Sequence, residues 1–139
     1  RDVYSGRLQL HGEENEFTAI AASNYASSLS SLRRFEEVKT LMRKMIPVAR
    51  RVLGDSDIIT YKMRSLYANA LKEDPAATRD DLREAINTLE ETERTARRVL
   101  GGAHPLVVDI ERDLRVSRAA LGAHETATEF LKNMMTPRP

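Results

Sequence analysis

The chain has 139 residues, which suits one domain, and 41% of them are hydrophobic and 31% charged. The charges nearly cancel (22 Lys and Arg against 21 Asp and Glu), and a net charge of +1 disfavours a nucleic-acid partner bound through bulk charge. There is no Cys, which excludes disulfides and thiol nucleophiles, and no run of about 18 apolar residues, which argues against membrane insertion.

Apolar residues recur at every third or fourth position through most of the chain, which predicts helices and an all-α fold. The predicted helices are residues 1–11, 14–31, 34–53, 56–72, 79–100, 105–121 and 124–135. The glycines placed to end helices in the left-handed conformation are Gly12, Gly54, Gly101 and Gly122. Thr78 and Asp81 have the spacing of a capping box, and Pro47 inside the third predicted helix is expected to bend it.

The sequence repeats itself. The string ARRVLG occurs at Ala49–Gly54 and again at Ala96–Gly101, 47 residues later. Three of these glycines are also followed, after six and then seven residues, by a similar pair. The three sets are Gly12, Thr18 and Tyr25; Gly54, Thr60 and Tyr67; and Gly101, Val107 and Leu114. The spacing predicts one domain over 1–139 with units of about 13–54, 55–101 and 102–135, each a pair of helices, and we expect a fragment of a longer protein.

Two stretches resemble a known family. LGGAHPLVVDIERDL (Leu100–Leu114) is similar to the L-G-x-x-H-P-x-T-L-x-x-x-x-N-L turn and helix of the 42-residue tetratricopeptide repeats (TPRs) of kinesin light chains. NYASSLSSLRRFEEV (Asn24–Val38) resembles the segment that joins the two helices of such a repeat. A looser likeness is to the helical C-terminal domain of SET–MYND methyltransferases. The resemblance implies a right-handed α-solenoid of about three TPR-like hairpins. In the second unit DSDI replaces the expected x-x-H-P, a departure from the pattern.

The resemblance also implies a peptide-binding groove lined by the first helix of each hairpin. If Tyr25, Tyr67 and Leu114 face the core, the residues one and two before them and two after them face this groove. The groove residues expected on that basis, with one helical turn added, are Ser23, Asn24, Ser27, Lys62, Ser65, Asn69, Lys72, Asp109, Arg112 and Asp113. In the family an Asn at the place of Asn24 holds the main chain of an extended peptide. The alternative is that these polar residues form a solvated face.

No catalytic set can be assembled from the remaining polar residues. His104 precedes Pro105 in the inter-repeat turn and is interpreted as a residue that stabilises this turn. His11 and His124 lack a second ligand at helical spacing, so we expect no metal and no cofactor. Paired arginines such as Arg97-Arg98 fall in last helical turns, where they favour the helix dipole, and this explains them better than RNA binding does.

The sequence therefore predicts a non-catalytic scaffold or adaptor in the cytoplasm, whose partner is a protein or an extended peptide. One alternative is the helical partner-positioning domain of a larger enzyme, such as a SET–MYND-type methyltransferase. Another is a purely structural or oligomerising module. Apolar residues near both ends also predict self-association through the terminal helices: Val3, Tyr4, Leu8 and Leu10, and Phe130, Leu131, Met134 and Met135.

Overall fold

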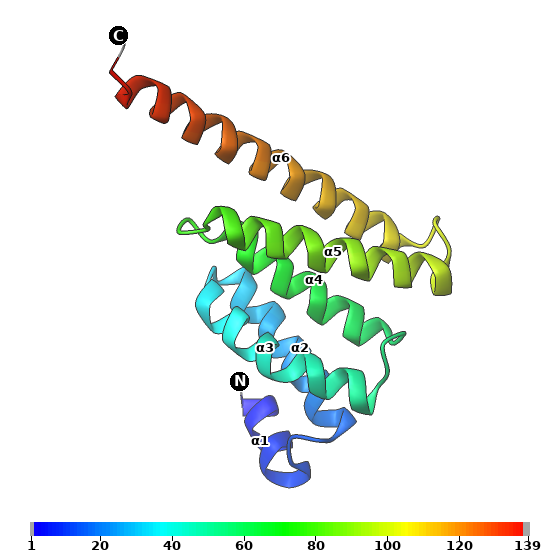
Figure 1. Cartoon of the computed structure of the whole chain (residues 1–139). Helices are drawn as coiled ribbons and strands as arrows, with labels where there is room; N and C mark the ends of the chain where they lie inside the picture. The colour runs from blue at the N-terminus through cyan, green and yellow to red at the C-terminus, as the bar shows by residue number, and fades with distance from the viewer. Residues whose placement is uncertain (1, 138–139) are drawn as a thin grey trace.

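The computed structural model describes residues 2–137, and this part of the chain is built of α-helices joined by short connections (Figure 1). The helices are α1 (Asp2–His11), α2 (Glu16–Ser31), α3 (Phe35–Val52), α4 (Ile58–Glu73), α5 (Arg79–Leu100) and α6 (Pro105–Met135). Within residues 2–137 there is no strand, so the all-α prediction is confirmed. None of these helices combines the length and the apolar content that crossing a membrane requires.

The helices pack in chain order, each against the next, and short connections make neighbours antiparallel (Figure 1). In addition α2 contacts α4 and α4 contacts α6, so these three helices form a continuous row. On one side of that row, α3 packs against α2 and α4, and α5 packs against α4 and α6. One face of α2, α4 and α6 is therefore left clear of α3 and α5.

Local side-chain chemistry fixes where the helices begin. The side chains of Asn15 and Asp57 accept hydrogen bonds from backbone N–H groups in the first turns of α2 and α4, each at 2.8 Å. At α5, Thr78 and Asp81 form the predicted capping box. His104 caps α6 by accepting the Leu106 N–H at Nδ1, which confirms its interpretation as a turn residue. Each cap satisfies a donor that the helix itself cannot.

The repeated spacing of six residues corresponds to a hydrogen bond. Gly12 and Gly54 have positive φ, as predicted, and turn the chain between helices. The hydroxyls of Thr18 and Thr60, both fully buried, donate to the carbonyls of these glycines at 2.7 and 2.8 Å. This bond ties the first turn of each following helix to the preceding connection. In the third copy Val107 is fully buried at the same position and has no hydroxyl to donate.

The break predicted at Gly122 is wrong, and residues 124–135 are not a separate helix. Instead α6 continues from Pro105 to Met135, and Gly122 lies inside it rather than among the positive-φ glycines. The physical reason is that a glycine alone costs a helix only about 1 kcal/mol. Gly54 and Gly101 are followed by turn and capping residues before the next helix, whereas Gly122 is followed by Ala and His and then by further helix-compatible residues.

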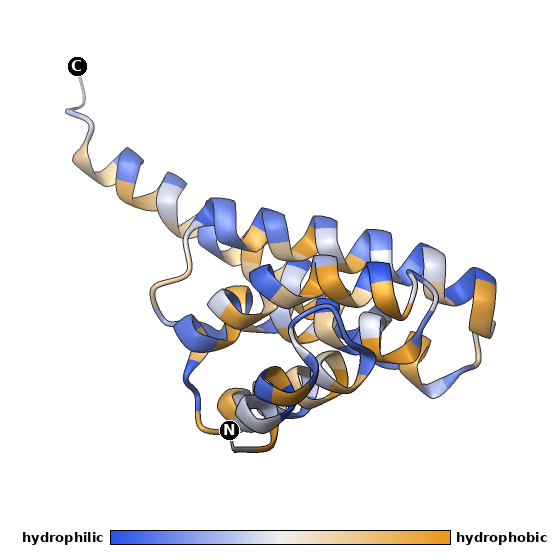
Figure 2. Cartoon of the chain, turned by 90° about the horizontal axis from the view of Figure 1, so that it is seen from below, coloured by the Kyte–Doolittle hydropathy of each residue, from blue (hydrophilic) through white to orange (hydrophobic). Residues whose placement is uncertain are grey.

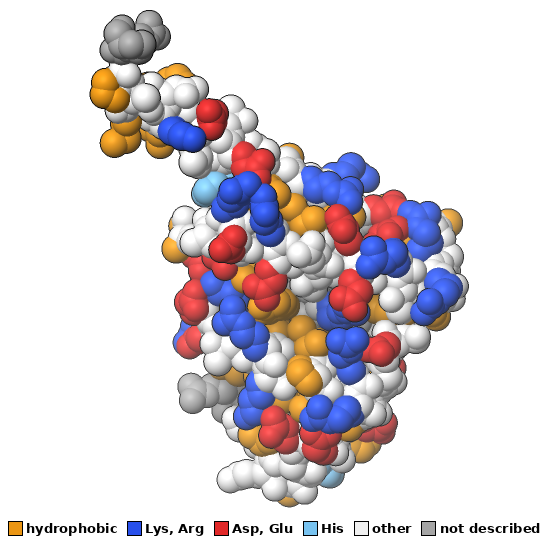
Figure 3. Space-filling view, in the orientation of Figure 1, with side chains coloured by type: hydrophobic (Ala, Val, Ile, Leu, Met, Phe, Trp, Pro, Cys, Tyr) orange, Lys and Arg blue, Asp and Glu red, His pale blue; other side chains and the backbone are white. Residues whose placement is uncertain are grey.

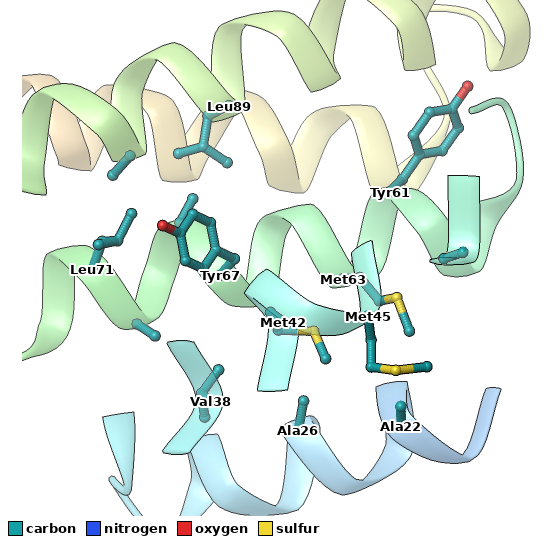
Figure 4. Packing of buried hydrophobic residues seen from close by; sticks show 14 of the residues in the cluster. Ala22, Ala26, Val38, Met42, Met45, Tyr61, Met63, Tyr67, Leu71 and Leu89 are labelled. Atoms are coloured by element: carbon teal, nitrogen blue, oxygen red, sulfur yellow. The ribbon is translucent and has the colours of Figure 1, made fainter. Parts of the chain in front are cut away.

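The core lies between the row of α2, α4 and α6 and the two helices that cover it, α3 and α5. Small and flexible side chains interlock there. Met42 and Met45 of α3, with Met63 of α4, point toward Ala22 and Ala26 of α2, and all five are fully buried (Figure 4). Alanine lets the helices approach, and the unbranched methionines fill the remaining space. Hydrophobic and hydrophilic residues are interspersed along the helical ribbons (Figure 2).

The two terminal helices differ from each other. On α1, Tyr4 is buried and stacks on Tyr25 of α2 at 5.9 Å between ring centroids, so this residue of the expected self-association surface is covered within the chain itself. Leu8 is also partly buried against the core, because α1 folds back onto α2. The last turns of α6 extend past the other helices, and hydrophobic side chains gather there (Figures 1 and 3).

Candidate binding groove

A cavity of about 460 Å³ lies where α2, α4 and α6 meet. Its lining residues are Ser23, Asn24, Ser27, Lys62, Ser65, Leu66, Asn69, Leu106, Asp109, Ile110, Arg112 and Asp113. We call this cavity the groove. All the groove residues expected from the sequence, except Lys72, are in this set. Positions that are up to 90 residues apart in the chain therefore meet at one place, as the repeat spacing predicts.

Helical geometry explains why these positions converge. On α4, Lys62, Ser65 and Asn69 follow one another at spacings of three and four, which puts them on one helix face. The neighbouring Tyr67 is buried, and so is Leu114, which comes directly after Asp113 on α6. The buried side chains set the rotation of each helix, and the polar residues beside them then face the groove.

Lys72 is the one residue of the expected set that does not line this cavity. Asn69 donates its side-chain N–H to a carboxylate oxygen of Asp113 at 3.1 Å, which places these two residues level with each other. Asp113 is the last lining residue on α6. Lys72 is almost one helical turn beyond Asn69 and therefore lies past the end of the groove.

The polar groups of the groove are only partly paired. Asp109 forms an exposed ion pair with Arg112 at 3.1 Å, and Asp113 accepts the bond from Asn69. Two further atoms, Ser65 Oγ and Asn69 Oδ1, are buried and have no hydrogen-bond partner. Leaving a buried polar atom unpaired costs about 1–3 kcal/mol, so such atoms mark places where a ligand can add a bond that the free chain lacks.

The expected set named only polar residues, although Leu66, directly before Tyr67, satisfies the same spacing. Leu66, Leu106 and Ile110 contribute to the groove, and Ile110 is almost fully buried. These residues belong to the apolar stripes that pack the helices together, and sequence reasoning assigns such residues to the core. Only the meeting of three helices shows that their edges also form the floor of a cavity.

A polar network behind the groove holds α4 in place. The hydroxyl of Tyr67 accepts a hydrogen bond from Arg43 of α3 at 3.2 Å and donates one to Glu84 of α5 at 2.5 Å. Burial, and after it the bond to Glu84, raises the pKa of Tyr67 above its ordinary value, so the hydroxyl keeps its proton. The network thus ties α4 to both helices on its far side and fixes the face that α4 presents to the groove.

Other surfaces offer less organised chemistry. Cationic and anionic side chains intermix over the face shown in Figure 3, without a patch of one sign. Among residues 2–137, no three His, Asp or Glu side chains are grouped so that they could hold a metal ion. No protein-family model, curated protein sequence or solved structure matches this chain.

Proposed function

We propose that this chain is a non-catalytic binding module which holds an extended peptide segment of a partner protein in the groove. The proposed architecture is a right-handed α-solenoid of TPR-like hairpins, with α2, α4 and α6 on the binding side. One observation carries the proposal: residues chosen by helical spacing on three separate helices line a single cavity of about 460 Å³. A solvated face would need no such convergence.

The chemistry of the lining suits an extended peptide. The side chains of Asn24 and Asn69 each offer an amide, which can donate to a peptide carbonyl and accept from a peptide N–H. Ser27 and Ser65 add hydroxyls with the same double capacity. Leu66 and the other apolar residues of the floor provide a surface for a side chain. Main-chain bonds would provide affinity, and the shape and charge of the lining would select the sequence.

The decisive experiment blocks the groove and compares it with a neighbouring position. Peptides selected from a displayed random library on the wild-type chain are titrated against Ser27→Trp and Ser28→Trp variants. Ser27 lines the groove, whereas Ser28 is exposed on the same helix and does not line it. We expect Ser27→Trp to weaken binding at least tenfold and Ser28→Trp to leave it within about twofold. A selection that yields no binding peptide, or equal effects of both variants, would refute the proposal.

A second candidate function, assembly of the chain with itself, is favoured by a different observation. The end of α6 exposes Phe130 by 63% and Met134 by 68% of their surface, and both lie outside the groove. Large exposed apolar side chains on one helix are typical of a contact surface. This function does not exclude peptide binding, because the two surfaces use different residues.

A further inference from the structure

The end of the groove formed by α4 and α6 is rich in hydrogen-bond acceptors whose bonds are not completed. Asn69 Oδ1 is buried without a partner, and Asn69 lies against Asp113 of α6. One helical turn before Asn69, Ser65 Oγ is also buried and unpaired. A carboxylate, an amide oxygen and a hydroxyl therefore converge on one part of the cavity, and the first two can only accept.

The direction of the Asn69 side chain is fixed by its neighbour. Its amide nitrogen donates to Asp113 Oδ2 at 3.1 Å. Turning the amide over would place its oxygen against the carboxylate, and two acceptors would then repel each other. The amide oxygen is consequently held as a free acceptor, next to the negative charge that orients it.

The negative charge of Asp113 lacks a cation. Asp109, one turn earlier on α6, is paired with Arg112, but none of the ion pairs within residues 2–137 includes Asp113. Lys62 also lines the groove, yet it precedes Asn69 by seven residues, about 10 Å along the axis of α4. In the described part of the chain Lys62 forms no ion pair either, so the groove is polarised, with an unpaired cation toward one end and an uncompensated carboxylate at the other.

We propose that the Asn69–Asp113 end of the groove binds a basic side chain, Lys or Arg, of the peptide. An ammonium or guanidinium group supplies several donors and a positive charge, so it can bond to Asn69 Oδ1 and to the Asp113 carboxylate together. This inference rests on the proposed function and specifies the class of partner, a peptide with a basic residue at that point. A neutral donor would satisfy the amide oxygen and leave the charge of Asp113 unpaired.

The test begins with two selections from the same displayed random library, one on the wild-type chain and one on an Asp113→Asn variant. Asn has nearly the same shape as Asp and can still accept the bond from Asn69, so the fold is retained, which circular dichroism checks. We expect Lys or Arg to be enriched at one position of the wild-type ligands and not among the ligands of the variant. Asp80→Asn is the control, because Asp80 is exposed in the first turn of α5, away from the groove.

The second stage measures the charge pair directly. The strongest wild-type peptide is titrated with its basic residue intact and with that residue replaced by norleucine or citrulline. Asp113→Asn should weaken the basic peptide about tenfold and its neutral analogue less than about twofold, while Asp80→Asn changes neither. The affinity of the basic peptide should also fall as salt is raised.

The outcomes separate this inference from the proposed function. Peptides that are blocked by Ser27→Trp but carry no enriched basic residue would overturn the inference and leave the proposed function standing. Equal weakening of the basic and neutral peptides by Asp113→Asn would also overturn it. A failure to select any peptide would refute both.

Discussion

Lys39 of α3 and Asp74, at the end of α4, form an ion pair 35 positions apart in the sequence, with 2.9 Å between Nζ and Oδ2. Both side chains are largely buried, and Lys39 also contacts Glu36 at 2.6 Å. Burial alone would lower the pKa of Lys39, but the bonds to Glu36 and Asp74 more than offset it and raise the pKa. The N–H of Ala76, and then Lys39, lowers the pKa of Asp74. The pair fixes the connection between α4 and α5 against α3.

Because of this ion pair, we expect the free energy of unfolding to fall at low pH. The stabilisation from the lowered pKa of Asp74 is complete above the ordinary value of 3.8 and is lost as the pH falls through the lower folded value. The wild-type chain should therefore lose more unfolding free energy than Asp74→Asn between about pH 5 and pH 2. Urea denaturation at several pH values measures this, with Asp80→Asn as the control. Parallel pH profiles of wild type and Asp74→Asn would contradict it.

The threonine bonds to the preceding glycines predict a pair of opposite substitutions. Thr60→Val removes the hydroxyl that donates to the Gly54 carbonyl and should lower the unfolding free energy by about 1 kcal/mol, because the carbonyl then keeps only the longer bond from the Asp57 N–H, at 3.4 Å. Val107→Thr introduces a hydroxyl at the equivalent place in the third unit, where by analogy with Thr18 and Thr60 we expect it to donate to the Gly101 carbonyl. We expect that change to cost less than about 0.5 kcal/mol or to stabilise the chain. Equal losses in both variants, measured by denaturant unfolding, would show that the bond contributes nothing.

Gly122 should behave as an ordinary helical position. An added Cβ at Gly122 meets no atom within 4 Å, so Gly122→Ala should raise the unfolding free energy by about 0.5–1 kcal/mol. Gly54 also has open space around it, but its φ of +96° strains any other residue, and Gly54→Ala should destabilise by about 1–2 kcal/mol. Thermal and denaturant unfolding measure both. Destabilisation by Gly122→Ala would indicate a turn at this position in place of the continuous α6.

The end of α6 predicts self-association at high concentration. A seam of residues at alternating spacings of four and three runs along the last two thirds of α6, as in a coiled coil. The seam consists of Val116, Ala120, Ala123, Ala127, Phe130 and Met134. Phe130→Glu combined with Met134→Glu should therefore weaken assembly at roughly millimolar protein, measured by light scattering or sedimentation.

The matched control for that experiment introduces two glutamates at exposed apolar positions outside the seam. Val99 and Val108 are 48% and 46% exposed and lie outside the seam, so Val99→Glu with Val108→Glu should leave assembly unchanged. Ser27→Trp, which fills the groove, should leave it unchanged as well. A wild-type chain that stays monomeric at roughly millimolar concentration would refute self-association, and assembly that survives the double Glu variant would place the contact elsewhere.

Periodicity and repeat spacing predict the parts of this molecule that depend on local pattern. The start of α5 follows from the capping-box spacing of Thr78 and Asp81. The convergence of Asn24 with Asn69 and Asp113 follows from helical spacing. Long-range polar contacts leave no such pattern, because any of several exposed charges could pair with Lys39. The continuation of α6 through Gly122 was also not predicted. A glycine suggests the end of a helix, but it ends one only where turn residues follow it.

The length of α6 has a mechanical consequence. Its 31 residues span about 46 Å, and its first half carries the groove residues Asp109 and Asp113. Arg79 and Arg83 of α5 hold Glu125 at 3.2 and 3.6 Å, and beyond this point about 15 Å of helix is unsupported. These ion pairs lie about two thirds of the way along the helix, between the groove residues and the exposed tip. Because a helix is a stiff rod, a tilt of about 10° at Glu125 would displace Met135 by about 3 Å, so the tip amplifies any change in the angle of α6.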